Sequence, residues 1–480
     1  MPLLQEIHVA PIQIDRFAGV AAARHLHDLR RLADGLRVRL GGRVVWNISS
    51  TAAGGGVAEM LQRLVGYARG AGFDARWLVI AGNTDFFRVT KRLHNALHGE
   101  RGDGSALDSS ARAVYEDTLR ENAAELGAHV RRGDIVFLHD PQTAGLIPSL
   151  AAAGGALVWR CHVGADERNA EDRAAWEWLR PYLEQVHQCV FTRTQYVPDY
   201  LQSRSTIIPP TIDPLSPKNQ PMTAATVHAI LAHAGVVDGR PTRGRPVFRR
   251  TDGTPTRVER KVQLVSAGGP PPWDAPMIAQ VSRWDRLKDP AGVLRGFASF
   301  VGEPIADGAH LMLAGPESEG VTDDPEGAEV YAEVSAQWAE LPQMIRRRVH
   351  LVSLPMEDIE ENAAIVNALQ RHAKVVVQKS LREGFGLTVT EAMWKARPVI
   401  GSDVGGIHDQ IESGKSGLLV DPHSIDEFRA GLIWMFADAE RAQAVGKAGR
   451  ARVRNEYLGV HSLLRWGALL GRTVEMGTTP

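Results

Sequence analysis

Short apolar runs that alternate with amphipathic helical stretches constrain the fold of this chain more than any other feature. From residue 43, apolar strands are predicted at 44–48 and 76–80, with a helix at about 57–69 between them. Further strands are predicted at 135–139, 157–162, 190–192 and 206–208, and further helices at 112–126 and 170–188. This alternation is typical of parallel β/α units, so the first part of the chain predicts a doubly wound sheet.

A second series of the same kind begins at residue 277. Its predicted strands are 277–281, 310–314, 350–353, 374–377 and 398–401, with a helix near 291–300. The sequence therefore predicts an α/β protein of two doubly wound Rossmann-like domains that face each other across a cleft. In such sheets, ligands bind outside the carboxyl ends of the strands.

The segment between the two series has a different composition. It is rich in basic residues, Gly and Pro and has little periodicity, apart from a predicted helix at 224–234. We therefore expect an N-terminal domain at 1–213, a linker with an insertion at 214–274 and a C-terminal domain at 275–457. The last apolar helix lies beyond the second series, and a return of 458–480 to the first domain is one arrangement that the sequence allows. The insertion proper, 239–272, has no assigned role.

Composition excludes several classes of protein. The chain has 480 residues, enough for two or three domains. Its 55 basic and 56 acidic residues give a net charge of −1, so no global field attracts nucleic acid or an anionic membrane. The sequence has neither a signal-peptide pattern nor 18 consecutive apolar residues, and its two cysteines lie in apolar runs. We expect a cytoplasmic protein that is neither secreted nor embedded in a membrane.

Residues 378–391 place two carboxylates, Glu383 and Glu391, on either side of a turn that contains glycine. The turn joins the predicted strand 374–377 to a helix. A helix that begins after such a turn presents unpaired backbone N–H groups, which bind phosphate and other anions. This arrangement suits a sugar that is joined to a diphosphate.

Two further groups of residues have the chemistry of an anion site. Gly54, Gly55 and Gly56 precede the helix at 57–69, where glycine lets a ligand approach the backbone amides. A tight βα turn without a ligand is the alternative for these glycines. Arg283 and Lys288 follow the strand 277–281 and could neutralise a diphosphate, although Arg and Lys are also common on solvated surfaces.

Polar residues also end two strands of the first series. His139, Asp140 and Gln142 follow one strand, and Arg160 and His162 end the next. Side chains at these ends face the predicted cleft, whereas a hydrogen-bonded core histidine is the alternative for either imidazole. The sequence contains no D-x-D pair, so we expect anchoring by amides and cations without a metal ion.

The stretch from Glu383 to Glu391 resembles the E-x7-E motif of the retaining glycosyltransferases of family GT4, whose fold is GT-B. Other stretches resemble the trehalose glycosyltransferring synthases within that family. They are Trp46-Asn47 to Ala58, Phe86-Phe87 with Thr90-Lys91 and His94-Asn95, 138–142 and 281–290. The resemblance covers about 40–215 and 275–472.

This resemblance implies a role for each candidate residue. Arg283 and Lys288 would bind the donor diphosphate, Glu383 the hydroxyls of the transferred glucose, and Glu391 the ribose. The remaining implied ligands are His162 beside the anomeric carbon and O6, the loop Gly384, Phe385, Gly386 and Leu387 at the sugar, and Gly55 and Gly56 over the phosphates. Acceptor glucose would contact the first domain through Asp140, Gln142 and Arg160.

The implied reaction transfers glucose from ADP-glucose or UDP-glucose to free glucose and gives trehalose reversibly, with the anomeric configuration retained. No other cofactor is implied. In the GT4 pattern no carboxylate lies on the opposite face of the sugar, so a front-side route is implied in which the acceptor hydroxyl attacks as the diphosphate leaves.

Two other functions are compatible with the sequence. One is a trehalose phosphorylase that uses glucose 1-phosphate, and the other is a non-catalytic sensor of sugar nucleotides. The sequence leaves open the donor nucleotide (ADP, UDP or GDP), the acceptor, the physiological direction and whether the chain forms a homodimer.

Overall fold

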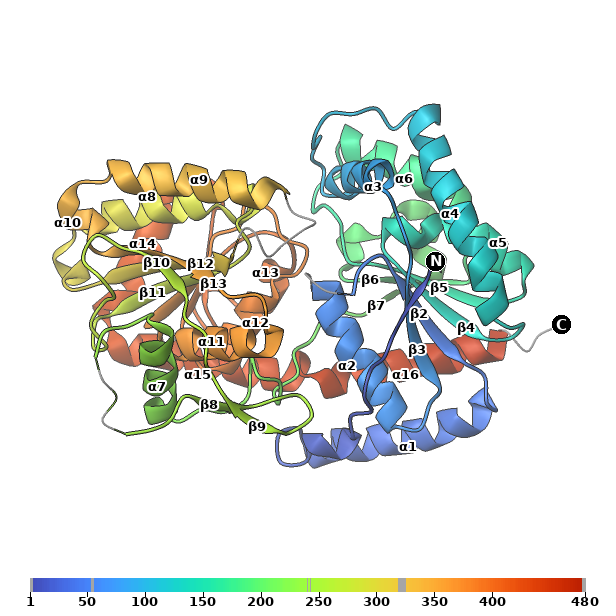
Figure 1. The fold of residues 1–480 in the computed structure, drawn as a ribbon, viewed down its shortest axis with the longest axis horizontal. Helices are drawn as coiled ribbons and strands as arrows, with labels where there is room; N and C mark the ends of the chain where they lie inside the picture. Colours follow the sequence, from blue (N-terminus) through green and yellow to red (C-terminus); the bar gives the residue numbers. More distant parts are fainter. Residues whose placement is uncertain (1–2, 53–55, 240, 242, 318–324, 477–480) are drawn as a thin grey trace. The chain divides into compact units, whose positions relative to one another are not determined.

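The structure is a computed structural model that describes residues 3–52, 56–239, 241, 243–317 and 325–476. Its contacts divide the chain into two compact units (Figure 1). The first unit consists of Met1–Pro210 and Gly459–Pro480, and the second of Thr211–Leu458. The C-terminal helix thus belongs to the first unit.

The first unit contains, within the described residues, a seven-stranded sheet in the order β1-β3-β2-β4-β5-β6-β7. Strand β1 is antiparallel to β3, and the other neighbours are parallel. The strands are β1 (Gln5–Ile7), β2 (Val45–Ser49), β3 (Ala75–Val79), β4 (Ile135–His139), β5 (Ala156–Cys161), β6 (Gln188–Phe191) and β7 (Ser205–Ile207). The chain order reverses between β2 and β4, which is the topological switch point of this sheet.

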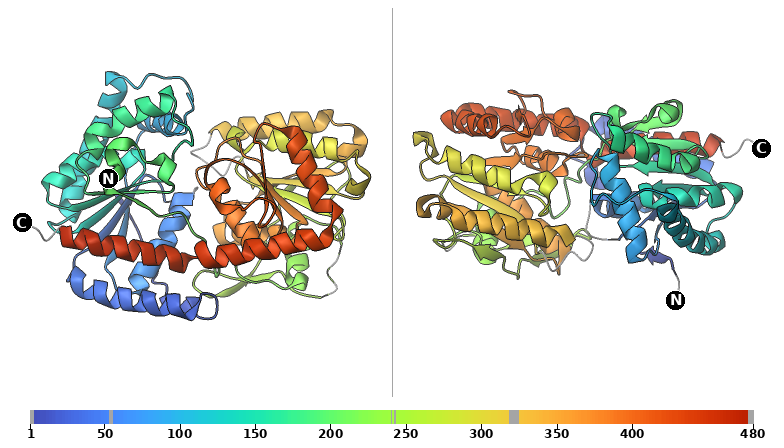
Figure 2. Two further views of the ribbon diagram at one scale, coloured as in Figure 1. Left: turned by 180° about the vertical axis from the view of Figure 1, so that it is seen from behind. Right: turned by 90° about the horizontal axis from the view of Figure 1, so that it is seen from above.

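Helices cover both faces of this sheet (Figure 2). One face packs against α3 (Thr84–Leu97), α4 (Ser109–His129), α5 (Ile147–Ala152) and α6 (Ala170–Leu183). The other packs against α1 (Ala23–Leu40), α2 (Gly56–Gly70) and α16 (Gly459–Met476). Successive side chains of a strand point to opposite faces of the sheet. Trp46 therefore packs in the core on the α3–α6 side, and Val45 packs in the core on the α1 and α16 side.

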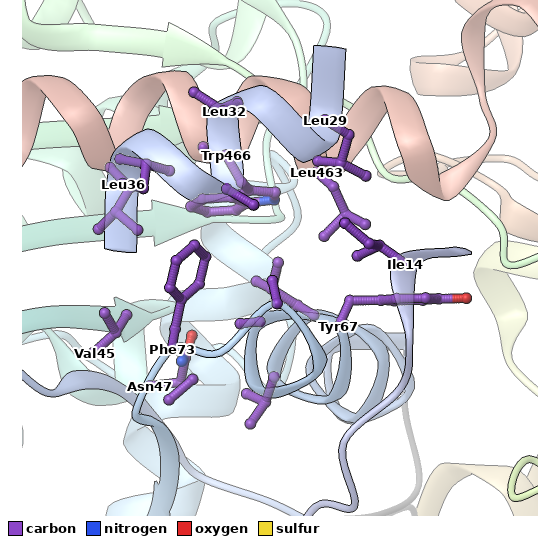
Figure 3. Close-up of a pocket in the computed structure, with 18 of the residues that line it drawn as sticks. Ile14, Leu29, Leu32, Leu36, Val45, Asn47, Tyr67, Phe73, Leu463 and Trp466 are labelled. Carbon is purple, nitrogen blue, oxygen red and sulfur yellow. The ribbon is translucent and has the colours of Figure 1, made fainter. Parts of the chain in front are cut away.

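An apolar cavity lies on the α1, α2 and α16 side of the first sheet (Figure 3). Leu29, Leu36, Phe73 and Trp466 are among its lining residues. Apolar walls of this kind do not suit a sugar or a diphosphate, so we do not assign the substrate site to this cavity. One polar lining residue, Asn47, extends toward the strand ends, where its Oδ1 lies 3.3 Å from His139 Nε2.

The second unit contains a sheet of the same construction. Seven strands in the described part of this unit have the order β10-β13-β12-β11-β14-β15-β16, with β10 antiparallel to β13 and the others parallel. They are β10 (Gln263–Val265), β11 (Met277–Val281), β12 (His310–Pro316), β13 (Val349–Leu354), β14 (Val375–Gln378), β15 (Val399–Ser402) and β16 (Leu418–Val420). The six parallel strands have the 3-2-1-4-5-6 order of a Rossmann fold, with the switch point between β11 and β14.

The helices of the second unit also form two layers. Helices α8 (Pro290–Phe300), α9 (Pro325–Glu340), α14 (Ile425–Ala437) and α15 (Ala439–Glu456) share one apolar core with the sheet. Helices α11 (Ile359–His372) and α12 (Leu387–Trp394) contact strands β11, β14 and β15. The remaining helices are α7 (Ala224–Ala234), the short α10 (Gln343–Arg346) and α13 (Gly405–Gln410).

Residues 214–274, which the sequence indicates to be a linker with an insertion, lie in the second unit. Helix α7 packs on α11, and β10 extends the sheet beyond β13. Strands β8 (Val247–Arg249) and β9 (Pro255–Arg257) form a separate antiparallel ribbon. Ion pairs of Arg250 with Asp358 and of Arg260 with Glu361 fasten the segment to the start of α11. Helix α7 docks through buried apolar side chains, and the rest of the segment docks through polar contacts and three-residue strands, which show little hydrophobic periodicity in the sequence.

An aromatic stack holds the end of this segment in place. The ring of Trp273 lies between those of His228 and His372, with a centroid distance of 4.2 Å on each side. The stack therefore joins α7, α11 and the loop that leads into β11. Burial, with smaller contributions from the charges of His228 and Arg397, lowers the pKa of His372 from 6.5 to about 4.

We expect this stack to make the stability of the protein depend on pH. Between pH 6.5 and about 4 the unfolded chain binds a proton at His372 that the folded chain excludes, so the free energy of unfolding falls as the pH falls across this window, by at most about 3 kcal/mol for this group. His372→Phe keeps the stacking but removes the titrating group. The difference between the free energies of unfolding at pH 7 and pH 4.5, measured by urea denaturation, should therefore be smaller in this variant than in the wild type. An unchanged difference in His372→Phe would show that His372 is not the source of the pH dependence.

Candidate functional site

Two neighbouring loops meet at the switch point of the second sheet. Strand β11 leads into the loop that contains Arg283 and Lys288, and its neighbour β14 leads into the loop that contains Glu383. The backbone N–H of Leu381 donates to the carbonyl oxygen of Leu287 at 2.7 Å, which joins the loops directly. The sheet order thus brings together residues that are 95 positions apart in the chain.

An ion pair between Lys288 and Glu383 lies at this junction. Lys288 Nζ is 2.7 Å from Glu383 Oε2, and the side chains are 18% and 11% exposed. The Ser380 hydroxyl donates to the same carboxylate oxygen at 3.2 Å. A pair this little exposed is screened weakly by water, so it fixes both side chains and leaves part of each open to a ligand.

The glycine turn before α12 has the geometry of an anion site. Gly386 is the N-cap of α12 and lies in the left-handed region, with φ of 85°, so this position has no side chain to cap the first turn of the helix. The amides of Gly384 to Leu387 therefore lie at the positive end of the helix dipole. The buried side-chain amide of Gln410 donates to the carbonyl oxygens of Phe385 and Gly406 and holds the turn from behind. Gly406 must be glycine, because a Cβ there would lie 2.5 Å from Phe385 Cα.

Arg283 and Glu391, the other predicted donor-side residues, differ in their surroundings. The Arg283 side chain is 45% exposed, and its Nη2 lies 3.5 Å from Asp285 Oδ2. Glu391 is only 1% exposed and lies on α12, where its Oε1 is 3.2 Å from Lys218 Nζ. The structure thus places Arg283 at the surface of the loop and Glu391 in the interior beside a lysine that sequence reasoning did not identify.

A buried lysine supports the same junction. Lys379, 1% exposed, follows β14, pairs with Asp289 and donates to the carbonyl oxygen of Pro422 at 2.7 Å. Asp289 has φ of 48° and caps α8 by accepting from Gly292 N at 2.9 Å. The side-chain amide of Gln280 donates to Lys288 O at 2.9 Å. These contacts fix the backbone on both sides of Lys288 and Glu383, and no motif in the sequence points to them.

A second polar cluster lies where β4 and β5 of the first unit end. His162 Nδ1 is 3.0 Å from both carboxylate oxygens of Asp140, and the His162 backbone N–H donates to Asp140 Oδ1 at 2.8 Å. Asp140 has φ of 64°, a conformation that is rare for a residue with a side chain and is found most often at functional sites. The structure therefore joins two of the predicted first-domain residues directly.

Arg160 and His139 complete the cluster. Arg160 Nε donates to His162 Nε2 at 2.5 Å, and its guanidinium lies 4.8 Å from the ring centroid of Trp466 on α16. The rings of His139 and His162 stack with centroids 5.8 Å apart. Sequence reasoning left a core histidine open for His139, and its ring is indeed buried and hydrogen-bonded to Asn47.

Burial and neighbouring charges set the ionisation of this cluster. Burial lowers the pKa of His162, and Arg160 lowers it further against the opposing effect of Asp140. Burial also lowers the pKa of His139 well below its usual value. For Asp140 burial acts against ionisation, but His162 outweighs it and brings the pKa to about 2. At neutral pH the cluster holds neutral imidazoles between a carboxylate and a guanidinium.

Two predicted residues have fewer described contacts. Gln142 lies in the turn after β4, and its Oε1 is buried without a partner among the described residues. Gly56 begins α2, whereas Gly55 lies outside the described residues. One residue that sequence reasoning missed, Thr192, follows β6 and also has a buried hydroxyl that lacks a partner in the described part of the chain.

The described residues contain no group of three or more His, Cys, Asp or Glu side chains arranged to hold a metal ion. Among the described helices, none combines the length and apolar character needed to cross a bilayer.

Comparison with known proteins identifies the family. Residues 47–198 match the family model "Trehalose synthase, N-terminal domain", and residues 269–452 match "Glycosyl transferases group 1". A trehalose synthase from Rubrobacter xylanophilus is 34% identical over 95% of this chain and 96% of its own length. A trehalose phosphorylase from Grifola frondosa is 27% identical over 97% of this chain and 61% of its own length.

A solved structure supports the fold. The UDP-forming trehalose-phosphate synthase from Burkholderia vietnamiensis aligns with a TM-score of 0.64 at 14% identity, over 91% of this chain and 99% of that one. The predicted GT-B fold, with two Rossmann-like domains, is therefore confirmed. With both sheets and the near full-length relative in agreement, the chain is a glycosyltransferase that belongs to the trehalose synthase family.

Proposed function

We propose that this enzyme transfers glucose from a nucleotide-activated donor to free glucose and forms trehalose reversibly. The observation that carries the proposal is the Lys288 and Glu383 pair beside the amides that begin α12, because one cation, one carboxylate and a row of N–H donors are what a sugar joined to a diphosphate requires. The full-length similarity to a trehalose synthase supports the same reaction.

On the donor side, Lys288 and Arg283 would neutralise the diphosphate. Glu383 would accept hydrogen bonds from the hydroxyls of the transferred glucose, with the amides of Gly384 to Leu387 beside it. Glu391 would have to contact ribose while remaining next to Lys218, whose ammonium group lies 3.2 Å away. The switch point of the second sheet supports this placement, since open α/β sheets bind nucleotides there.

On the acceptor side, buried polar atoms at the ends of β4, β5 and β6 support a site for a hydroxylated ligand. Buried polar groups normally have a hydrogen-bond partner. At these strand ends, the buried side-chain atoms that lack a partner in the described part of the chain include His139 Nδ1, Gln142 Oε1, Arg160 Nη1 and Thr192 Oγ1. This mixture of donors and acceptors without a net negative charge suits glucose, with Asp140 and His162 beside it.

The reaction would proceed by front-side attack with retention of configuration. In this proposal Glu383 contacts the glucose hydroxyls and Asp140 lies on the acceptor side, so neither carboxylate has the role of nucleophile. The acceptor hydroxyl would attack as the diphosphate leaves and would give its proton to a leaving phosphate oxygen. The protein would orient both sugars and stabilise the charge on the diphosphate through cations and amides.

A donor assay tests the proposal. Purified enzyme is incubated with glucose and, separately, with UDP-glucose, ADP-glucose, GDP-glucose or glucose 1-phosphate, and trehalose and its anomeric configuration are measured by NMR. We expect product with at least one nucleotide sugar, formation of that sugar nucleotide from trehalose and nucleoside diphosphate, and unchanged turnover in EDTA. If glucose 1-phosphate is the one donor that yields trehalose, the enzyme is a phosphorylase and the proposed function is wrong.

Phosphorolysis is the second candidate, and the similarity to the Grifola frondosa phosphorylase favours it. Inorganic phosphate would then take the place of the diphosphate at Lys288, and the Glu391 carboxylate would have no ribose to bind. Replacement of Glu391 by Gln separates the candidates, because it should raise the KM for a nucleotide sugar and leave the KM for glucose 1-phosphate unchanged.

A further inference from the structure

Both ring nitrogens of His162 are engaged by protein groups. Nδ1 faces the Asp140 carboxylate at 3.0 Å, and Nε2 accepts from Arg160 Nε at 2.5 Å. The side chain of His162 is only 13% exposed, so water does not compete freely for these contacts. The ring is therefore contacted on one side by a carboxylate, which accepts hydrogen bonds, and on the other by a guanidinium, which donates them.

The position of Arg160 is set by the protein. Its side chain is 1% exposed, its Nη2 donates to the carbonyl oxygen of Ile208 at 3.3 Å, and its guanidinium lies over the ring of Trp466. These contacts come from two other elements, the end of β7 and helix α16. Arg160 thus reaches His162 from a fixed position before any sugar binds.

This arrangement fixes the tautomer of His162. A guanidinium has only donors, so Nε2 can contact Arg160 only through its lone pair. The single proton of the neutral ring then lies on Nδ1, where it is donated to Asp140. A proton on Nε2 would place two N–H groups against each other and would leave the carboxylate without its donor.

We propose that Arg160 is a positioning residue that keeps His162 neutral, with its proton on Nδ1, in the sugar-binding cluster. The proposal rests on the proposed function for the reaction that it serves. Among the described residues, the charged groups that face His162 are Asp140, which favours the imidazolium, and Arg160, which opposes it. The stacked His139 is itself neutral, and Trp466 shields the outer side of Arg160.

The consequence for recognition is that the ring nitrogens of His162 are already occupied by protein groups. The Nδ1 proton is donated to Asp140, and the Nε2 lone pair accepts from Arg160. A sugar hydroxyl in this cluster would therefore contact the Asp140 carboxylate and Arg160 Nη1 rather than the ring nitrogens of His162.

Histidine NMR tests the proposal on the ligand-free protein. The long-range ¹H–¹⁵N spectrum distinguishes protonated from unprotonated ring nitrogens, and comparison with His162→Gln identifies the signal. We expect wild-type His162 at pH 7 to have a protonated Nδ1 and an unprotonated Nε2. A proton on Nε2, or an imidazolium at pH 7, would overturn the proposal.

A variant series supplies the second measurement. Arg160→Met removes the donor and the charge but keeps an apolar contact with Trp466, so the pKa of His162 should rise by about one unit or more. The variant should then lose activity as the pH falls through this raised value and regain it above, and Arg160→Lys should restore part of the wild-type profile. The exposed Arg180→Met is the control and should leave the His162 signal unchanged.

The outcomes remain separable. An unchanged His162 pKa and pH profile in folded Arg160→Met would overturn the proposal. If that variant does not fold, the tautomer of His162 in the wild-type spectrum and the pH profile of Arg160→Lys still test the proposal. The expected tautomer together with no transfer from any nucleotide sugar would reject the proposed function and leave the role of Arg160 intact.

Discussion

Replacement of Lys288 by Ala should lower kcat about 10²- to 10³-fold with little loss of stability, because a donor aimed at charge that develops in the transition state is worth this much in other enzymes. Lys288 is the cation that the structure fixes at the switch point, 2.7 Å from Glu383. Its contribution should be greatest as the diphosphate leaves. Steady-state kinetics with the active donor, and thermal unfolding of the same samples, measure the two effects.

Lys415 offers a matched control within the same unit. It pairs with Glu412 at 2.9 Å, and both side chains are more than half exposed. A surface pair of this kind contributes little, so Lys415→Ala should leave both kcat and the unfolding temperature nearly unchanged. A wild-type kcat in Lys288→Ala would show that Lys288 does not take part in the reaction.

The sequence predicted the strands of both sheets to within two residues where apolar periodicity was strong. Strand β4 (Ile135–His139) and helix α7 (Ala224–Ala234) have the predicted bounds. Prediction failed for β1, β10 and β16, three-residue strands at the edges of the two sheets, because a strand this short has too few side chains to show a period. It also passed over α1, whose amphipathic pattern precedes the first predicted strand.

The candidate site was predictable in part for a different reason. Lys288 and Glu383 follow two strands that the order of a Rossmann sheet places side by side, so topology alone brings them together. The supports of these residues come from far along the chain and belong to no motif. Gln410 holds the turn at Phe385, Lys379 pairs with Asp289, and Lys218 pairs with Glu391. Such contacts depend on the packing of side chains, which a single sequence does not reveal.

Replacement of Glu383 by Gln should lower kcat/KM about 10²-fold or more. Gln keeps the shape of the side chain and can still accept from Ser380 and Lys288, but it removes the negative charge that strengthens hydrogen bonds to the glucose hydroxyls. The effect should therefore appear in catalysis while the unfolding temperature changes little. The surface variant Glu412→Gln is the control. A wild-type kcat/KM in Glu383→Gln would show that the carboxylate of Glu383 does not bind the glucose hydroxyls.

The double variant Lys288→Ala/Glu383→Gln shows whether the two residues act as one unit. If Glu383 contacts the sugar and also orients Lys288 toward the diphosphate, removal of the cation makes the orienting role redundant, and the double variant should lose less than the product of the single effects. If each residue acts only on its own part of the donor, the two losses should multiply. Their separation of 2.7 Å and low exposure lead us to expect strong coupling, with a double variant that loses well under the product of the single effects. Full multiplication would show that the ion pair is a feature of the sugar-free protein that the bound donor replaces.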